Sequence, residues 1–503
     1  MKCMWYGCWV GIFSLFLMSC TSNSPLELAL ELAGDNSLEL KKVLQYYSDN
    51  PQKQKAAEYL IVNMPYHFSR ESFFVNRGGE KIRPDVERIA DKRQMSQYVD
   101  SLQRAGYWMD GHNRYDIHVI DSEYLIRHIE LAFDVWCKPW ARDVSFDDFC
   151  RYILPYRSQC EMLSDTREML RDHYLPLLDS AGVTSTYEAC LLMNARLKKD
   201  IRYADVGNPL SATVEETFRS GRGTCDALCD YAIHAMRSVG IPVVVRQTLW
   251  TRMDRGHVWG AVLSEGQFHD FNPADIQAGE YADILYSRLH LRPAKVYQRH
   301  YDAVSDYRLP GRNDGYATFL KNPLLVDVSS LQQVPDYTLR IPVNGNDLLR
   351  KDGILYLCAF NNHRWCPVAM GRYDGAGQAV FEHVLGRNIF IVSEYDEAGS
   401  FHYVSSPVCT YEDGSVSVLS EDMSQKVTHT FLKEDIGKAY SLGYWDSQQM
   451  RFVDLFCHVE TDSTQTYINI PANALLYYRS GEFDLNNRVG IIDNGIYKRT
   501  HEW

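Results

Sequence analysis

Residues 221–230 read GRGTCDALCD, and they mark the point where a glycine-broken loop is predicted to become a helix. Thr224 is a suitable N-cap residue, and from Cys225 onward apolar residues recur at helical spacing as far as Val239. Gly240 then favours termination. The pattern therefore predicts a helix that begins at Cys225 and ends near Val239.

A cysteine in this position is a candidate nucleophile. The unpaired N–H groups and the partial positive charge at a helix N-terminus favour the thiolate over the thiol. The same N–H groups can bind the oxyanion that forms when a thiolate attacks a carbonyl. Gly221 and Gly223 allow a substrate to approach the backbone, whereas the carboxylate of Asp226 works against a low thiol pKa. Without partners, a cysteine at a helix start is more typical of a structural residue.

Suitable partners lie further along the chain, because a thiolate enzyme needs a histidine to carry the proton and an acceptor to orient the imidazole. His257 follows Cys225 by 32 residues, and Asp270 follows His257 by 13 residues. Short β-strands bounded by turn residues are predicted over residues 243–250, 257–263 and 267–271.

The loop between the last two strands decides whether His257 and Asp270 share a face of the sheet, because strand side chains alternate between faces. A loop of two or four residues, with Trp259 opposite Asp270, would place Asp270 diagonal to His257. A three-residue loop would instead bring His269 to that face. A triad therefore requires an even loop or a β-bulge.

These residues together resemble the core of the transglutaminase-like family, a circularly rearranged relative of papain. The resemblance rests on the Gly-x-Gly-x-Cys start of the helix, on Gly240-Ile241-Pro242 after it, on His257-x-Trp259, and on Asp270 before Asn272-Pro273. It covers about residues 181–285 and implies a catalytic triad. In that triad Cys225 would be the nucleophile, His257 the general acid and base, and Asp270 the orienting acid.

Other residues near these positions have open roles. His269 stands where many relatives have an apolar residue, and it either competes for the imidazole role or lies on the surface. Cys229 is a buried bystander or a modulator of the thiol, and Arg222 either supports an anion or is an exposed loop residue. Tyr203 and Gln247 are of the right chemical types to bind an oxyanion, but nothing in the spacing selects either.

The first residues have the features of a bacterial signal peptide. Lys2 precedes an apolar run over residues 9–18 that is too short to cross a bilayer comfortably. Leu17-Met18-Ser19-Cys20 resembles a lipobox, which implies removal of residues 1–19 and lipid attachment at Cys20. We therefore expect a lipid-anchored protein of the cell envelope, on the outer membrane and with its face undetermined. The layout resembles that of lipoproteins from Bacteroidetes.

The composition excludes several classes of protein. The chain has 503 residues, of which 45% are hydrophobic and 23% charged, as in folded multidomain proteins. Its net charge of −13, without a basic block, is not typical of nucleic-acid binding. Its 13 cysteines are too sparse for a disulfide scaffold, no Cys/His spacing indicates a metal site, and no cofactor is expected.

The hydrophobic pattern predicts a multidomain α+β protein. The signal peptide (1–19) precedes an α-helical N-terminal region (20–180). A transglutaminase-like core (181–325) is predicted to pack a helix on an antiparallel sheet. A β-sandwich-like domain (326–422) and a C-terminal β-rich domain (423–503) complete the chain.

The triad predicts an enzyme in which Cys225 attacks an amide carbonyl, His257 protonates the leaving amine, and the thioester passes to water or to an amine. We expect hydrolysis of a peptide or amide substrate derived from cell wall or from protein. The alternative is a catalytically silent scaffold that binds glycan, peptide or protein at the cell surface. A calcium-activated cross-linking enzyme is disfavoured, because the sequence has no EF-hand-like acidic loop. The oligomeric state stays undetermined.

Overall fold

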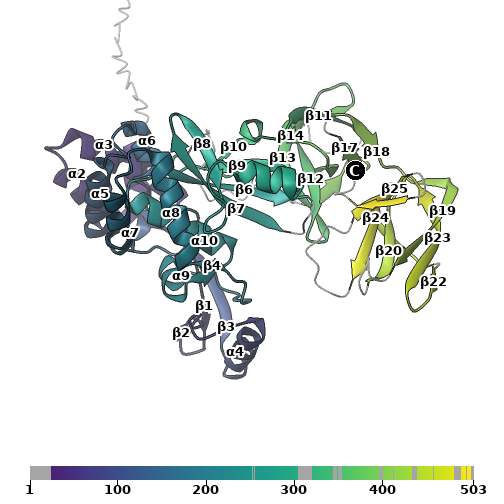
Figure 1. The fold of residues 1–503 in the computed structure, drawn as a ribbon, viewed down its shortest axis with the longest axis horizontal. Coiled ribbons are helices and arrows are strands. Elements are labelled where there is room, and N and C mark those ends of the chain that lie inside the picture. Colours follow the sequence, from purple (N-terminus) through teal and green to yellow (C-terminus); the bar gives the residue numbers. More distant parts are fainter. Residues whose placement is uncertain are drawn as a thin grey trace, which may run out of the picture.

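A computed structural model describes residues 24–251, 253, 255–303, 320–343, 348, 354–395, 400–411, 413–432, 439–456, 458–480, 489–493 and 496–499. The predicted signal peptide and Cys20 lie outside the described residues. The chain is elongated, with helices at one end, a central antiparallel sheet, and β-rich units at the other end (Figure 1). This arrangement confirms the predicted multidomain α+β class.

The helical end is built from amphipathic segments that bury one face each. Its helices are α1 (Pro25–Leu32), α2 (Ser37–Tyr46), α3 (Pro51–Asn63), α5 (Ser122–Trp136), α6 (Phe146–Tyr152) and α7 (Arg167–Ala181). The side chains of Leu40, Leu60 and Leu125 are completely buried among them. Capping favours these starts: Asn50, for example, accepts the N–H of Lys53 at the beginning of α3.

The N-terminal region also contains a small sheet that the helical prediction for residues 20–180 did not include. Strands β1 (Phe68–Val75), β2 (Lys81–Ile82) and β3 (Trp108–Tyr115) form an antiparallel sheet in the order β2-β1-β3. Helix α4 (Lys92–Arg104) lies between β2 and β3 in the sequence. The helix and the strands extend away from the helical end as an arm (Figure 1).

The central unit packs helices on a five-stranded antiparallel sheet. Its helices are α8 (Thr186–Asp200), α9 (Val214–Ser220) and α10 (Cys225–Ser238). The sheet has the order β10-β9-β6-β7-β8, with β6 (Val243–Trp250), β7 (Gly256–Ser264), β8 (Gln267–Phe271), β9 (Pro293–Arg299) and β10 (Leu325–Asp327). The predicted helix and the three predicted strands are confirmed, whereas β9 and β10 were not predicted.

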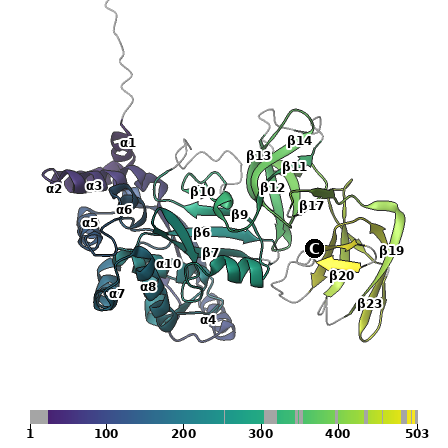
Figure 2. The same ribbon diagram turned by 45° about the horizontal axis from the view of Figure 1, so that its top comes forward.

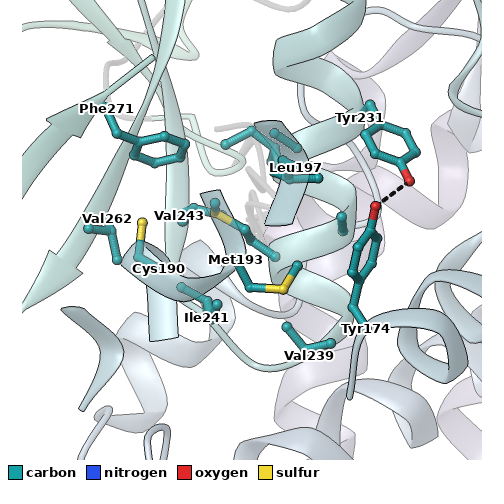
Figure 3. Close-up of a cluster of buried hydrophobic side chains, with 14 of the residues drawn as sticks. Tyr174, Cys190, Met193, Leu197, Tyr231, Val239, Ile241, Val243, Val262 and Phe271 are labelled. Carbon is teal, nitrogen blue, oxygen red and sulfur yellow. Dashed lines mark hydrogen bonds between the residues drawn. The ribbon is translucent and has the colours of Figure 1, made fainter. Parts of the chain in front are cut away.

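Helices α8 and α10 cover one face of this sheet (Figure 2). The core between them is drawn in Figure 3, where Met193 and Leu197 of α8 lie against Val243, Val262 and Phe271 of the sheet. At its edge the hydroxyl groups of two buried tyrosines, Tyr174 and Tyr231, are hydrogen-bonded at 2.8 Å.

Beyond β10 the described residues form mainly β-structure, as predicted. One sheet has the order β11-β14-β13-β12-β15-β17-β18, with β16 paired to β15. Its strands are β11 (Asp336–Pro342), β12 (Ile354–Asn361), β13 (Arg364–Tyr373), β14 (Gln378–Leu385), β15 (Ile389–Tyr395), β16 (Phe401–Tyr403), β17 (Val408–Thr410) and β18 (Val416–Val418). The C-terminal strands are β19 (Asp422–Leu432), β20 (Ala439–Asp446), β21 (Arg451–Leu455), β22 (His458–Glu460), β23 (Thr464–Ala472), β24 (Leu476–Ser480), β25 (Val489–Asp493) and β26 (Ile496–Arg499). Among the described residues, no helix has both the length and the apolar character needed to cross a membrane.

The close contact between Gly260 in β7 and Phe271 in β8 generates a prediction for stability. A Cβ atom at Gly260 would lie 2.2 Å from Cζ of the Phe271 ring, which is itself fully buried. Gly260→Ala should therefore lower the free energy of unfolding by about 1–3 kcal/mol, because the packed ring has to move.

Calorimetric unfolding measures this effect, with Gly256→Ala on the same strand as the control. A Cβ atom at Gly256 would make only an ordinary contact, 3.4 Å from the carbonyl oxygen of Thr248. Equal unfolding temperatures for the two variants would contradict the prediction.

Candidate active site

The position of Cys225 is set by the short segments on either side of it. Before α10, β5 (Arg222–Gly223) pairs in parallel with β4 (Arg202–Tyr203), and Thr224 has extended backbone dihedrals as an N-cap. A Cβ atom at Gly223 would lie 2.7 Å from the Cβ of Ala227, so the glycine permits the tight entry into the helix. Cys225 is therefore the first residue of α10, as predicted.

Arg222 lies beside this entry but does not face an anion. Its guanidinium donates to the carbonyl oxygens of Val86 at 2.7 Å and Ile89 at 2.5 Å. Arg83 from the same arm donates to both carboxylate oxygens of Glu216 in α9, at 2.8 and 2.9 Å. These contacts fasten the arm to the loop that precedes Cys225.

The thiol of Cys225 is held in its neutral form. Burial, together with the negative charge of Asp226, raises the pKa of Cys225 to about 11. The backbone N–H groups of Asp226 and Val258 oppose this shift by hydrogen bonding to the sulfur. The neighbouring carboxylate and burial thus outweigh the expected effect of the helix N-terminus.

The hydrogen bond from the N–H of Val258 to the sulfur places Cys225 beside the first residues of β7, which include His257. Both Cys225 and His257 line one cavity of about 870 Å³. Within the part of the chain that the structure describes, no hydrogen bond joins the two side chains. Burial lowers the pKa of His257 to about 4, an effect that the charge of Asp275 opposes, so the imidazole is neutral near pH 7.

The imidazole of His257 stacks between two tryptophan rings. Its centroid lies 5.6 Å from that of Trp250 and 5.7 Å from that of Trp259. Because strand side chains alternate, these residues belong to the face of the sheet opposite to Val258, which packs against the helices. The imidazole is thus held by aromatic neighbours rather than by a carboxylate.

The β7–β8 hairpin has the even loop that the triad requires, but a different register from the predicted one. Ser264 pairs with Gln267 across the two-residue turn formed by Glu265 and Gly266, and Asp270 pairs with Ala261. The prediction that Trp259 lies opposite Asp270 is wrong. Asp270 does share the face of His257, but it is displaced along the strand.

The carboxylate of Asp270 is engaged by other groups. It accepts two hydrogen bonds from Nη1 of Arg246, at 2.8 and 2.9 Å, and one from Nε1 of Trp259 at 2.8 Å. Arg246 is only 2% exposed and also donates to Gln298 at 3.1 Å. Burial raises the pKa of Asp270, and Arg246 opposes that shift. In the described structure no hydrogen bond joins Asp270 to His257.

The same register places Asn272 opposite Trp259 and diagonal to His257, if the pairing of Gly260 with Phe271 is continued by one residue. Nδ2 of Asn272 donates to Asp275 at 3.0 Å, and its Oδ1 has no hydrogen-bond partner among the described residues. The turn that holds it is fastened by Asn194 of α8, whose amide donates to the carbonyl oxygen of Ile276 at 3.0 Å and accepts the N–H of Ala274 at 2.8 Å.

Asn272 was not among the predicted site residues, because the family resemblance implied Asp270 as the acceptor. The signal was the length of the turn: a two-residue Glu-Gly turn, counted forward, aligns Asn272 with Trp259. Glu265 adopts a φ of 51° there, which is uncommon for glutamate and could not be read from its residue type.

The cavity also contains both oxyanion candidates. Gln247 pairs with Val258 across the sheet, and Tyr203 accepts a hydrogen bond from Arg255 at 3.0 Å. Gln247 lies on the strand next to the N–H group that contacts Cys225, and its amide makes no hydrogen bond in the described structure. It is therefore the better placed of the two.

The remaining residues with open roles have structural surroundings. Cys229 is fully buried in the core and is a free thiol. His269 packs edge-on against Tyr187 of α8, on the opposite face of the sheet from His257. Among the described residues, no three His, Cys, Asp or Glu side chains are grouped so that they could hold a metal ion.

Comparisons with known proteins show a family relationship for one segment of the chain. No curated protein matches the chain. The solved structure of a candidate cysteine protease from Cytophaga hutchinsonii matches over 22% of this chain and 38% of that chain, with 12% identity and a TM-score of 0.20. The aligned segment thus spans less than half of that protein. The profile of the transglutaminase-like superfamily matches residues 178–273. These residues therefore form a transglutaminase-like domain within the longer chain.

Proposed function

We propose that this protein is a cysteine hydrolase of the transglutaminase-like type, which cleaves a peptide or amide bond through a thioester. The observation that carries the proposal is the shared cavity of Cys225 and His257, with the cysteine at a helix N-terminus. A cavity of about 870 Å³ has room for several peptide atoms around the scissile bond.

The chemistry begins with both groups neutral. The sulfur of Cys225 bonds to the carbonyl carbon while its proton passes to His257, which acts as a general base. Collapse of the tetrahedral intermediate breaks the C–N bond, and His257 returns the proton to the leaving amine. Water, deprotonated by His257, then attacks the thioester carbonyl and releases the acid and the free thiol. We expect the imidazole to reach the sulfur when substrate is bound, because catalytic hydrogen bonds often tighten only in that complex.

The oxyanion of each tetrahedral intermediate needs donors near Cys225. The N–H groups at the start of α10 are one source, and the side-chain amide of Gln247 is the second group in our proposal. Its placement on β6 opposite Val258 supports this role.

We propose Asn272 as the residue that orients His257. An asparagine can hold an imidazole in its productive tautomer, as in papain-like enzymes with a Cys-His-Asn arrangement. Asp270, for which the sequence predicted this role, is held by the buried guanidinium of Arg246. The diagonal position of Asn272 and its unbonded Oδ1 favour the asparagine.

The cellular setting is also a proposal. A lipid at Cys20 would tether the chain to the outer membrane of a bacterium, where cell-wall peptides or proteins supply amide substrates. The lipobox-like sequence Leu17-Met18-Ser19-Cys20 supports this location.

A scaffold that binds glycan, peptide or protein without turnover is the second candidate function. The raised pKa of Cys225 favours it, and so does the lack of a hydrogen bond between Cys225 and His257 in the described structure.

Replacement of Cys225 by alanine tests the enzyme against the scaffold. We expect Cys225→Ala to abolish cleavage of peptide and cell-wall libraries, as measured by mass spectrometry, and to remove the label that a thiol-reactive amide probe leaves on the peptide containing residue 225. Cys137→Ala, which removes an exposed free thiol elsewhere, should leave cleavage and the labelling of Cys225 unchanged. Undiminished cleavage by Cys225→Ala, or a native chain that binds peptides but cleaves none, would refute the enzyme.

Substitutions at Asn272 and at Asp270 show which of the two residues orients His257. Asn272→Ala should lower kcat roughly tenfold to a hundredfold with little change in unfolding temperature, and Asn272→Asp should restore part of the activity, because both residues can accept from the imidazole. Asp270→Asn should instead lower the free energy of unfolding by about 3 kcal/mol or more, because it leaves Arg246 buried without its counter-charge. Steady-state kinetics and calorimetry measure both effects, and the opposite pattern would return the orienting role to Asp270.

Alkylation of Cys225 should depend on pH in a way set by its raised pKa. Only the thiolate reacts, so below about pH 11 the rate with iodoacetamide should rise about tenfold per pH unit. Asp226→Asn removes a charge that raises this pKa, and it should increase the rate at pH 8 by roughly twofold to tenfold. Glu215→Gln in α9 serves as the control. A rate that is already at its plateau near pH 7 would show a thiolate–imidazolium pair instead.

A further inference from the structure

The cavity around Cys225 has a second wall that belongs to a different part of the chain. Seven of its lining residues come from the large β-sheet beyond residue 353, outside the segment that matches the transglutaminase-like profile. They are Arg364, Trp365, Cys366, Pro367, Val368, Tyr395 and Phe401.

This wall is fixed to the loop that leads into His257. Asn361, which is 2% exposed at the end of β12, donates from Nδ2 to the carbonyl oxygens of Trp250 and Met253, both at 2.7 Å, and of Arg255 at 3.2 Å. Asn361 pairs with Arg364 across the two-residue turn between β12 and β13. The hydrogen bonds of Asn361 therefore fix the β12–β13 turn, and with it the backbone of Arg364, at the cavity.

Further hydrogen bonds hold the two units together along β9. The hydroxyl of Tyr297 donates to the carbonyl oxygen of Val368 at 2.7 Å, and Nζ of Lys295 donates to the carbonyl oxygens of Glu382 and His383 at 2.8 and 3.0 Å. The cavity is thus walled by two units in fixed contact.

Arg364 differs from the other cations that line the cavity. Lys295 is ion-paired with Asp327, and Arg255 lies 3.9 Å from the carboxylate of Asp205. The guanidinium of Arg364 is exposed and makes no hydrogen bond or ion pair in the described structure. It therefore presents five unused donors to whatever occupies the cavity.

The surroundings of Arg364 favour one class of anion. A guanidinium matches a carboxylate in two parallel hydrogen bonds and balances its single charge. A phosphate carries more charge than this one unpaired cation offsets. Tyr395 and Phe401, which are both half-buried, line the same cavity with aromatic side chains, and such side chains suit the hydrocarbon part of a peptide.

We propose that the substrate carries a carboxylate that binds Arg364 while its scissile amide lies at Cys225. The substrate class is thus an acidic peptide: one with a free C-terminal carboxylate or an acidic side chain near the cleaved bond. This inference rests on the proposed hydrolase function and adds to it the group that selects the substrate. Arg364 is a specificity residue, since it contacts the substrate away from the reacting atoms.

A peptide library made in paired forms tests the proposal. Each peptide is synthesised with a C-terminal carboxylate and with a carboxamide, and with Glu or Gln at each internal position, so that the two sources of the carboxylate are distinguished. The native chain should prefer one acidic form. Arg364→Gln should lower kcat/KM for that form by roughly tenfold to a hundredfold, mainly through KM, and leave the amide form unchanged.

Arg372→Gln is the matched control, because Arg372 lies on the same strand but does not line the cavity. Arg364→Lys keeps the charge but loses the two-pronged donor, and it should give an intermediate kcat/KM. Unfolding temperatures show whether each variant folds. Equal losses on acidic and amide peptides, or no preference in the native chain, would overturn the proposal.

Measurements of peptide binding test carboxylate recognition independently of the proposed hydrolysis. If no peptide is cleaved, the same paired peptides are titrated calorimetrically into the Cys225→Ser chain. A preference for the acidic forms that is lost in Cys225→Ser/Arg364→Gln would support carboxylate recognition without catalysis. Equal binding of both forms would reject it even if cleavage occurs.

Discussion

The packing of α10 on one face of the central sheet is the contact on which the rest of the site depends. Leu228, Ala232 and Met236 of this helix are at most 5% exposed against the sheet and α8. Burial of the leucine and methionine side chains stabilises the fold by about 1.5–3 kcal/mol each. Because the helix is rigid, this packing carries its first residue, Cys225, to the start of β7 beside Val258. Hydrophobic contacts thus bring Cys225 and His257 to one cavity, and no hydrogen bond joins their side chains in the described structure.

The two polar residues at the end of the β7–β8 hairpin, Asp270 and Asn272, have different surroundings. Asp270 faces the buried guanidinium of Arg246, so its charge is used to compensate another buried charge. Asn272 lies two residues further, where the strand has ended and a turn begins, and its carboxamide oxygen is left unbonded. A carboxylate already committed to a guanidinium is a poor partner for a neutral imidazole, whereas a neutral amide costs little to keep beside it.

Much of this could be predicted from the sequence. Helical spacing after Thr224 identified α10, and short runs of β-type residues between turn residues identified β6, β7 and β8. Strand β9 was missed because its polar residues, Lys295 and Gln298, are buried by partners far away in the chain. Strand β3 of the arm was missed because all but its last residue is exposed, which leaves no hydrophobic alternation to detect.

By itself, the sequence determined the nucleophile candidate, its place at a helix start, the histidine on a following strand and the α+β class, because these depend on local spacing. Only the tertiary structure decided the register that pairs Asp270 with Ala261, which cations are paired, and which distant strands wall the cavity. Register follows from a turn whose backbone dihedrals are not coded by residue type alone, and the fate of a buried charge depends on a partner brought from elsewhere in the chain.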